Sequence, residues 1–447
     1  MDPENKIKMS EGRAWYLVAI LTLANLSSFI DRQILALLVK PIKRDLHITD
    51  TQVSLLMGLS FALFYTFFGV LIARMADKYN RKNIVTLGVA AWSVMTALCA
   101  GVKSYGQFFL ARTGVGIGES TLSPSAFSMI SDSFKKQRLG LASSVFTMGV
   151  FVGSGVAMLI GSMIVAKLPE TGTVHLPILG EVFPWQLIFI YIGLPGLVIA
   201  LLLRTIVEPD RKNVQSDPPA NNFISLIDSF KIIFHHSKAY ILICLATSCQ
   251  AFINYGANAW LPTFISRTYG WPVPKAGLYY GLILMTASVC GALAGGWSSD
   301  RLIKKGILHG RILISLICGI LCLLFSFLPL LPKAEWAILC AFIPGFATAA
   351  PYGAAAAALQ EMMPNRVRAQ AIAILLFILN LIGMGMGPTF VALMTDKVFM
   401  NESEIRYSLV SMYLVGSILM IIFSLMAFRP YTRAISSSNP ASALTES

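Results

Sequence analysis

The feature that most constrains this chain is a series of long apolar runs separated by short polar segments. Twelve runs can be read, at residues 14–39, 51–73, 83–102, 105–130, 139–166, 184–203, 239–266, 275–298, 311–331, 335–360, 369–394 and 407–428. A bilayer core about 30 Å thick needs about 20 apolar residues per helix, whereas a barrel strand needs about 9–11 residues of alternating polarity. The runs are long and do not alternate. We therefore expect an all-α integral membrane protein with twelve transmembrane helices.

Composition agrees with this class. The chain is 56% hydrophobic and 13% charged, about half the charged share of a soluble domain, so it has too few charges to cover a water-exposed surface. The polar segment 1–13 precedes a run long enough to span, so we expect no cleavable signal peptide. All seven cysteines fall inside the runs, and Cys318 and Cys322 share a helix face without a neighbouring histidine or carboxylate. We expect no disulfide, no metal site and no cofactor.

The net charge of +13 raises the question of a nucleic-acid partner, which its distribution argues against. If both termini are cytoplasmic, the cytoplasmic segments hold more than twice as many Lys and Arg residues as the segments on the other side. This is the bias that the positive-inside rule describes. We therefore expect cytoplasmic termini, a multi-pass protein of the cell (inner) membrane surrounded by membrane lipids, no nucleic-acid partner, and a monomer.

The longest polar stretch between runs divides the chain into two sets of six. It covers residues 204–238 and contains Pro209, Pro218 and Pro219. We expect four parts: a six-helix bundle over 1–203, a cytoplasmic linker over 204–238, a second six-helix bundle over 239–430, and a flexible cytoplasmic tail over 431–447.

The two sets share a charged loop at equivalent places. After the second run the chain reads Ala-Arg-Met-Ala-Asp-Lys-Tyr-Asn-Arg-Lys over residues 73–82, and after the eighth run it reads Gly-Gly-Trp-Ser-Ser-Asp-Arg-Leu-Ile-Lys-Lys over 295–305. Each places an acid and then a base at a cytoplasmic helix end. The repeat predicts that the two bundles are related by duplication.

The first of these loops resembles the loop motif of the major facilitator superfamily, G-x-L-a-D-R-x-G-R-[KR]. Ala73, Lys78 and Asn80 depart from that pattern, while the acid and the final basic pair are kept. The resemblance extends over the whole chain through the helix count, the central loop and the duplicated loop. It implies that these residues steady one conformation of a transporter, since a carboxylate near a helix N-terminus is favoured by about 0.3–1 kcal/mol. The gating candidates are Asp77, Arg81, Lys82, Asp300 and Arg301; the alternative is that they only anchor the topology.

Four ionisable residues lie well inside the runs: Asp31, Arg32, Arg112 and Glu119. A charge at the bilayer centre costs at least about 2.5–3.5 kcal/mol, so such residues are functional candidates. At about 1.5 Å per residue, Asp31 and Arg112 both lie about 7 Å outside the midplane, and Glu119 lies about 3 Å to its inner side. Arg112 and Glu119 share one helix face.

We interpret this group as a proton-coupling network. A carboxylate beside Arg⁺ stays charged, whereas a desolvated and unpaired one takes up a proton, so movement of an arginine between conformations would switch proton affinity. Asp31 is the first candidate for the proton carrier and Glu119 the second. The alternative is an interhelical clamp with no role in coupling.

Two motifs point to a branch of the superfamily. Residues 29–32 read Phe-Ile-Asp-Arg, and residues 112–124 read Arg-Thr-Gly-Val-Gly-Ile-Gly-Glu-Ser-Thr-Leu-Ser-Pro, followed by Ser-Met-Ile-Ser-Asp-Ser-Phe at 128–134. This is similar to the Spinster branch, although Ser120 stands where that branch has alanine. The resemblance implies an amphipathic lipid substrate such as a lysophospholipid or sphingolipid. Organic-anion:proton symporters keep a similar Asp-Arg and Glu, so the acids favour coupling more than they favour a lipid.

Polar residues at helical spacing are the candidates for lining a substrate site, because transporter sites lie near the midplane where helices are often broken. They are Asn25, Ser28, Gln250, Asn254, Tyr255, Asn258, Tyr352 and Asn380. Asn380 directly precedes the Gly- and Met-rich stretch 383–388, which we expect to bend. Each of these residues could instead form an interhelical hydrogen bond, worth about 0.6–2 kcal/mol.

The sequence thus predicts a proton-coupled secondary transporter working by alternating access on an amphipathic lipid. One alternative is a symporter of small organic anions such as sugar acids, with Arg32 or Arg112 binding the carboxylate. Multidrug efflux is a further alternative, since Gly149–Gly155 weakly resembles an antiporter motif but has Ser154 in place of proline. A membrane receptor or enzyme is least favoured, because no Walker loop, His/Cys cluster or nucleophile elbow is present.

Overall fold

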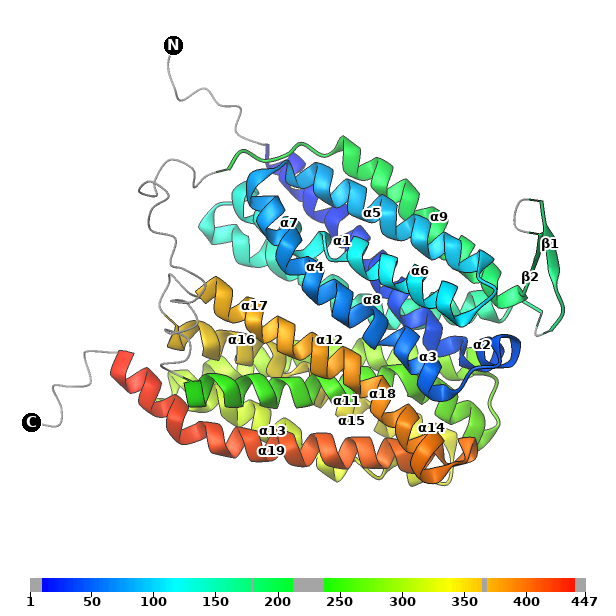
Figure 1. Ribbon diagram of the computed structural model, residues 1–447. Coiled ribbons are helices and arrows are strands. Elements are labelled where there is room, and N and C mark those ends of the chain that lie inside the picture. The colour runs from blue at the N-terminus through cyan, green and yellow to red at the C-terminus, as the bar shows by residue number, and fades with distance from the viewer. Residues whose placement is uncertain (1–9, 170, 178–179, 212–236, 364–367, 439–447) are drawn as a thin grey trace, which may run out of the picture. The chain divides into compact units, whose positions relative to one another are not determined.

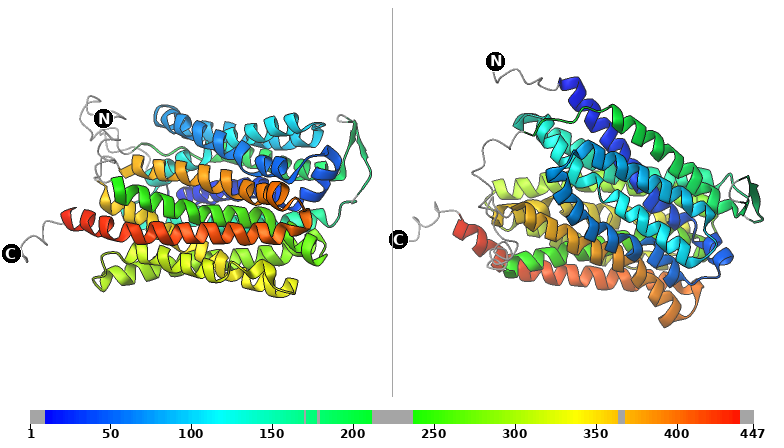
Figure 2. Two further views of the ribbon diagram at one scale, coloured as in Figure 1. Left: turned by 60° about the horizontal axis from the view of Figure 1, so that its bottom comes forward. Right: turned by 45° about the horizontal axis from the view of Figure 1, so that its top comes forward.

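The computed structural model describes residues 10–169, 171–177, 180–211, 237–363 and 368–438. Its contacts divide the chain into two compact units, Met1–His47 with Leu63–Ala220, and Ile48–Ala62 with Asn221–Ser447. Each unit is built of helices, and one two-stranded hairpin completes the regular structure of the described residues (Figure 1). Two further views show the same helices (Figure 2).

The first unit contains most of the first six runs. Its α-helices are α1 (Glu11–Gln33), α2 (Val39–Leu46), α4 (Leu59–Lys78), α5 (Arg81–Leu98), α6 (Tyr105–Glu119), α7 (Leu122–Ser133), α8 (Lys136–Val165) and α9 (Pro184–Thr205). The short 3₁₀ segments η1 (Ile34–Leu37) and η2 (Cys99–Gly101) extend α1 and α5. The strands β1 (Val174–Leu176) and β2 (Gly180–Val182) pair antiparallel, with Val174 opposite Val182.

The second unit contains the remaining helices. They are α3 (Asp50–Met57), α11 (Ser237–Tyr269), α12 (Val273–Lys304), α13 (Gly310–Leu324), α14 (Ala334–Cys340), α15 (Phe342–Ala349), α16 (Pro351–Met362), α17 (Arg368–Leu379), α18 (Gly387–Leu393) and α19 (Ile405–Ser438). Two segments are π-helical, η5 (Asn380–Met386) and η6 (Met394–Phe399), and two are 3₁₀, η4 (Leu328–Leu330) and η7 (Glu402–Glu404). The stretch 383–388, where we expected a bend, belongs to η5 up to Met386 and to α18 from Gly387.

Eleven helices in the described residues are long and apolar enough to cross a membrane. The one expected run not among these eleven is the fourth, 105–130. It forms two shorter helices, α6 and α7, which meet at Ser120 and Thr121. Pro124 explains this break, because proline cannot donate a hydrogen bond to the carbonyl four residues earlier and its ring crowds that carbonyl. The hydroxyls of Ser120 and Thr121 donate to Ile117 O and Gly118 O, at 2.6 and 2.8 Å, and so satisfy carbonyls near the break.

Close packing of helices depends on glycine where two backbones approach. In the first unit, a side chain at Gly118 would collide with the backbone of Trp92 and with Gly88 O, so α6 lies directly on α5. In the second unit, Gly291 and Gly295 bring α12 against the backbones of Phe346 and Ala350. Small residues at these positions are the usual means of close approach in membranes, where water does not drive helices together.

Helix α3 belongs to the second unit although it continues directly into α4. The side chain of Thr49 caps its first turn, and Gln52 returns a hydrogen bond to Thr49 N at 3.0 Å. At its far end Gly58 lies against the backbone of Met384. The contact of Gly58 with Met384 joins this segment to the second unit, with which Ile48–Ala62 clusters.

The last helix, α19, continues through Ser438, past residue 430 where we expected the second bundle to end. Tyr431 is fully buried there, and its hydroxyl donates to Glu361 Oε2 at 3.1 Å. These contacts hold the helix against α16 and α13. Residues 439–447 of the expected tail and 212–236 of the expected linker lie outside the described part of the chain.

Candidate functional site

Two helices of the first unit, α1 and α6, hold the four charged residues that the sequence singled out. Asp31 and Arg32 lie in the last turn of α1, while Arg112 and Glu119 lie on α6, seven residues apart. Asp31, Arg112 and Glu119 are at most 1% exposed, and Arg32 is partly buried. The structure therefore brings all four together inside one unit.

Arg32 and Glu119 form the ion pair of this group. Arg32 Nε donates to Glu119 Oε2 at 2.7 Å, and Nη2 lies at the same distance from that oxygen. The guanidinium also lies over the rings of Phe29 and Tyr65, 5.0 and 4.9 Å from their centres. Aromatic faces stabilise a cation most when both are desolvated. The pair is thus held by a carboxylate and by two aromatic rings.

Asp31 and Arg112 meet at the backbone of α1. Arg112 Nη1 donates to the carbonyl oxygen of Asp31 at 3.3 Å. The carboxyl atom Asp31 Oδ1 is buried and has no hydrogen-bond partner among the described residues, and the same is true of Glu119 Oε1. A buried carboxylate oxygen without a partner costs free energy unless the group is neutralised. Asp31 and Glu119 thus each keep one buried carboxyl oxygen without a hydrogen bond among the described residues.

Helix α6, which carries Arg112 and Glu119, packs closely on α5. Gly114 and Gly118 of α6 lie against Met95 and Trp92 of α5, and a side chain at either position would collide with them. Trp92 is fully buried. The low dielectric of such a site strengthens each remaining charge–charge interaction. Asp31 lies within electrostatic reach of both Arg112 and Glu119.

The second unit holds a chain of uncharged hydrogen-bonding side chains on α11. Asn258 Nδ2 donates to Asn254 Oδ1 at 3.1 Å, and Asn254 Nδ2 donates to Thr348 Oγ1 at 3.0 Å. Gln250 Nε2 donates to the backbone oxygen of Thr348. The spacing of four residues predicted one polar face, and the structure connects that face to α15. Gln250 Oε1 is buried without a hydrogen-bond partner in the described residues.

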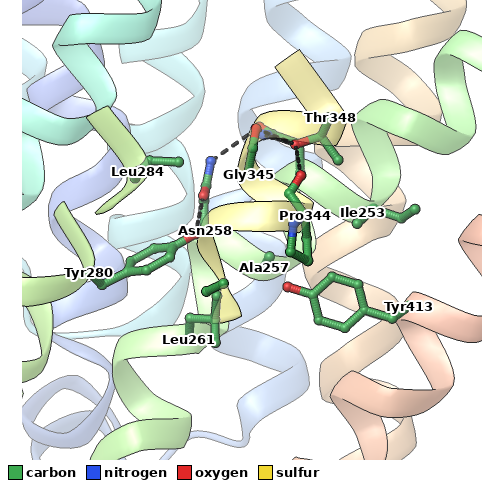
Figure 3. A pocket seen from close by; sticks show the side chains of 12 residues that line it. Ile253, Ala257, Asn258, Leu261, Tyr280, Leu284, Pro344, Gly345, Thr348 and Tyr413 are labelled. Atoms are coloured by element: carbon green, nitrogen blue, oxygen red, sulfur yellow. Dashed lines mark hydrogen bonds between the residues drawn. The ribbon is translucent and has the colours of Figure 1, made fainter. Parts of the chain in front are cut away.

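A small cavity lies beside this polar face (Figure 3). Tyr280 of α12 donates to Asn258 Oδ1 at 2.6 Å, and Tyr413 of α19 points toward the same space. The cavity measures about 10 Å³, which is room for about one water molecule. Tyr280 and Tyr413, which the sequence reasoning did not select, thus add two hydroxyls to the polar face.

The other lining candidates are distributed over both units. In the first unit, Asn25 Nδ2 donates to Phe146 O at 3.1 Å, and Ser28 Oγ donates to Asn25 O at 2.9 Å; both residues are buried. In the second unit, Tyr255 and Asn380 are partly buried, and Tyr352 is 37% exposed. Asn380 begins the π-helical stretch η5. Such stretches occur often at functional sites, so Asn380 stays a lining candidate.

The first charged loop is organised around Arg81, at the start of α5. Its side chain is 1% exposed and donates to Asp132 Oδ2 at 2.5 Å, Glu208 Oε1 at 3.2 Å and Pro209 O at 2.7 Å. Lys82 Nζ donates to Ile206 O at 2.9 Å. The loop therefore ties α5 to the ends of α7 and α9. Asp77 lies near the end of α4, and its side chain is outside the described part of the structure.

The second charged loop repeats this arrangement less tightly. Arg311, at the start of α13, binds Glu361 of α16 with two hydrogen bonds of 2.8 and 2.5 Å. Asp300 is mostly exposed, with its carboxylate 3.7 Å from Arg311 Nη1, and Arg301 lies over the ring of Trp297 at 5.0 Å. In both units, an Arg at the start of one helix thus pairs with an acid near the end of a later helix: Arg81 with Asp132 of α7, and Arg311 with Glu361 of α16. Asp132 and Glu361 were not selected from the sequence.

One buried ion pair was missed because its acid was placed outside the second run. Asp50 is fully buried in the first turn of α3, and Arg267 of α11 donates to both its oxygens at 2.6 and 2.8 Å. Asp396 accepts from Thr51 N and Oγ1, both at 2.7 Å. The capping sequence Thr49-x-x-Gln52 could have shown that the helix begins at Asp50.

Nothing in the described residues resembles a metal centre. No group of three or more His, Cys, Asp and Glu side chains in that part of the chain is placed to hold an ion, and the seven cysteines are all free thiols. The charged groups instead make ion pairs and hydrogen bonds with one another.

Comparisons of the sequence and of the structure with known proteins point to the same family. A sequence profile described as the Major Facilitator Superfamily matches residues 21–388. An MFS-type efflux pump of Mycolicibacterium smegmatis is 26% identical over 400 residues, covering 89% of this chain and 88% of that protein. The Drosophila melanogaster protein spinster is 25% identical over 304 residues, which is 66% of this chain but only 47% of that protein. The crystal structure of a bacterial homologue of the human lysosomal transporter Spinster, inward-facing and unoccupied, has a TM-score of 0.75 at 27% identity and covers 96% of this chain and 98% of its own.

Proposed function

We propose, from the premise that this chain belongs to the major facilitator superfamily, that it is a proton-coupled secondary active transporter working by alternating access. Membership makes the chain a multi-pass membrane transporter and not an enzyme. Proton coupling is the further step. The observation that carries it is the buried group in which Glu119 is paired with Arg32 while Asp31 Oδ1 has no hydrogen-bond partner in the described residues.

The proton step assigns a different role to each acid. Asp31 is the proposed carrier, because its carboxyl group is buried and its Oδ1 atom has no hydrogen-bond partner among the described residues, so that a proton would stabilise it, whereas Arg112 beside it stabilises the charged form. Glu119, which is paired with Arg32, is the second candidate for the proton carrier. Movement of Arg112 toward or away from Asp31 then decides whether the proton is held. Rearrangement between two conformations would thereby link proton uptake to transport.

For the substrate we propose an amphipathic lipid such as a lysophospholipid or sphingolipid. The support is the similarity to Spinster proteins, including the bacterial homologue that covers nearly the whole chain. In the second unit, Gln250, Asn254 and Asn258 offer amide groups and no charge. Uncharged donors and acceptors suit the hydroxyl and ester groups of a lipid headgroup. Tyr255, Tyr352 and Asn380 are proposed to extend this lining.

The topology proposal completes twelve spans. We infer that α6 and α7 together form the fourth span, interrupted at Ser120 and Thr121, in addition to the eleven candidate spans of the described residues. Broken helices in membranes persist where neighbouring groups satisfy the freed carbonyls, as the hydroxyls of Ser120 and Thr121 do here. Both termini are proposed to be cytoplasmic and the chain to act as a monomer, with the Arg81 and Arg311 clusters as cytoplasmic gates.

Efflux of small molecules is the second candidate function, favoured by the similarity to an MFS-type efflux pump over most of both chains. Symport of small organic anions is a third, in which Arg112 would bind the carboxylate of the substrate.

Transport assays in proteoliposomes separate these candidates. The purified chain is reconstituted with a labelled lysophospholipid, a labelled hexonate or a cationic dye, each with and without an imposed pH gradient. We expect gradient-dependent movement of the lysophospholipid. Gradient-dependent movement of the hexonate alone would establish anion symport, and movement of the dye alone would establish efflux. Equal rates with and without the gradient would overturn proton coupling.

A further inference from the structure

The hydroxyl group of Thr96, on α5, is a buried polar group that the proton step described above does not use. Thr96 is fully buried, and its Oγ1 completes no hydrogen bond among the described residues. A serine or threonine inside a helix can donate to the carbonyl oxygen four residues earlier, as Ser93 of the same helix does to Val89 O at 2.6 Å. Thr147 of α8 donates in the same way to Ser143 O at 2.9 Å. The Thr96 hydroxyl is therefore available to a group outside its own helix.

The group that this hydroxyl faces is the carboxyl group of Asp31, on α1, which lies within hydrogen-bonding reach of it. The hydrogen bond is not closed in this conformation, and Asp31 Oδ1 also lacks a partner in the described part of the chain. Cys99 follows Thr96 by three residues on the same face of α5 and lies near Asp31 and Arg112 as well. Its thiol donates to Met95 O at 3.3 Å instead. The Thr96 hydroxyl is thus the donor that this face of α5 offers to Asp31.

The elements packed around Asp31 carry several other groups that can titrate or are charged. Those near it are Arg32, Tyr65, Cys99, Arg112 and Glu119. Residues 143–165 of α8 include no titratable side chain. In α7, Asp132 is paired with Arg81, and in α9 the side chain of Tyr191 is exposed. Thr96 differs from the charged groups because its hydroxyl can donate to Asp31 without adding a charge to the site.

We propose that the Thr96 hydroxyl donates to the Asp31 carboxylate when Asp31 has released its proton, which makes Thr96 a positioning residue of the proton step. The role of Thr96 rests on the proposed function, because it acts only through Asp31. An ionised carboxylate is a stronger acceptor than a protonated carboxyl group. A hydrogen bond to the ionised form favours that form. Thr96 thereby helps to set the pH at which Asp31 releases its proton.

Infrared titration of the full-length protein in detergent tests this proposal without a substrate. The carbonyl stretching band of protonated carboxyl groups is followed against pH, and the part of the band that Asp31→Asn removes is assigned to Asp31. The test variant is Thr96→Val, which keeps the shape of the side chain and removes the hydroxyl; Thr96→Ala takes its place if the valine variant does not fold. Thr96→Ser restores the hydroxyl. Thr147→Val is the matched control, because that hydroxyl donates within its own helix.

We expect the titration midpoint of the Asp31 band to move to higher pH by roughly one unit in Thr96→Val, the size expected for loss of one hydrogen bond to a charged group. Thr96→Ser and Thr147→Val should titrate as the unmodified protein does. Apparent melting temperatures check that each variant is folded.

Three results would contradict this role, and they can be told apart. An unchanged midpoint in Thr96→Val would remove Thr96 from the proton step and leave Asp31 as the carrier. A shifted midpoint that Thr96→Ser shares would show that packing, and not the hydroxyl, is responsible. If no part of the band assigned to Asp31 titrates in the unmodified protein, the proposed proton coupling through Asp31 fails together with the role of Thr96.

Discussion

Arg32 of α1 and Glu119 of α6 form an ion pair with 2.7 Å between Nε and Oε2, although 87 residues separate them in the chain. The pair uses the arginine next to Asp31 in sequence, and the Asp31 carboxyl atom Oδ1 is left buried without a hydrogen bond in the described structure. The ion pair of Glu119 with Arg32, together with the unpartnered Oδ1 of Asp31, is the basis of the proposed proton step.

The pair itself can be tested by a double-mutant cycle on stability. Arg32→Gln and Glu119→Gln should each destabilise the protein by roughly 3–5 kcal/mol, because each leaves the other charge buried without its partner. The double variant should lose clearly less than the sum of the two. Apparent melting temperatures in detergent measure all four proteins, and strictly additive losses would show that the two residues do not interact.

Arg81 should be sensitive even to a substitution that keeps its charge. Its planar guanidinium donates to Asp132, Glu208 and Pro209 at once, which an ammonium group cannot reproduce. Arg81→Lys should therefore lower stability by about 1–3 kcal/mol. Lys82→Gln is the matched control, since its side chain makes one hydrogen bond to a backbone oxygen. Equal melting temperatures for the two variants would contradict the assignment of Arg81 as the centre of this loop.

Asp50 should hold α3 to the second unit through Arg267. Asp50→Asn removes the charge that Arg267 binds with two hydrogen bonds, so we expect faster amide hydrogen exchange across Asp50–Met57. Glu402→Gln serves as the control, because Glu402 is 58% exposed and its contact with Arg267 is at the surface. Surface pairs contribute about 0–1 kcal/mol. Unchanged exchange in the Asp50 variant would contradict this role and would mean that other contacts, such as Thr51 with Asp396, secure the helix.

Asn258 should affect substrate affinity and leave coupling intact. Asn258→Ala removes the group that accepts from Tyr280 and donates to Asn254, so we expect KM to rise about threefold to thirtyfold, corresponding to about 0.6–2 kcal/mol. The pH dependence should stay as in the unmodified protein, because the residue carries no charge. Thr286→Ala is the control, since that hydroxyl donates only to carbonyls of its own helix. A change in pH dependence without a change in KM would contradict a lining role.

The membrane helices could be predicted from the sequence, because whether a segment is long and apolar enough to span a membrane depends on that segment alone. Run length predicted membrane helices, and the loops around Asp77 and Asp300 predicted two related sets. It was not sufficient for the interruption of the fourth run at Ser120, where the effect of Pro124 on the backbone outweighs an apolar sequence. The length of α19 also depends on a tertiary contact, between Tyr431 and Glu361.

The site was predicted in composition but not in pairing. Depth along the helix axis placed Asp31 level with Arg112, yet it could not show that Arg32 would reach Glu119, because helix rotation is decided by packing against other helices. Gly114 and Gly118 have the four-residue spacing typical of close helix packing, but that spacing does not show that α6 packs on α5. Asp50 was missed for a related reason, since a charged residue at the start of a run looks like a loop residue until its partner Arg267 is known.

The most direct test of the central claim compares Asp31→Asn with the unmodified protein and with Glu335→Gln, which alters an exposed acid at the start of α14. Each protein is reconstituted in proteoliposomes with the substrate that the transport assays proposed above select. Two rates are measured: movement driven by a pH gradient, and exchange of labelled for unlabelled substrate without a gradient. The account predicts that Asp31→Asn loses gradient-driven movement and keeps exchange, while Glu335→Gln keeps both. Gradient-driven movement at the unmodified rate in the Asp31→Asn protein would contradict it.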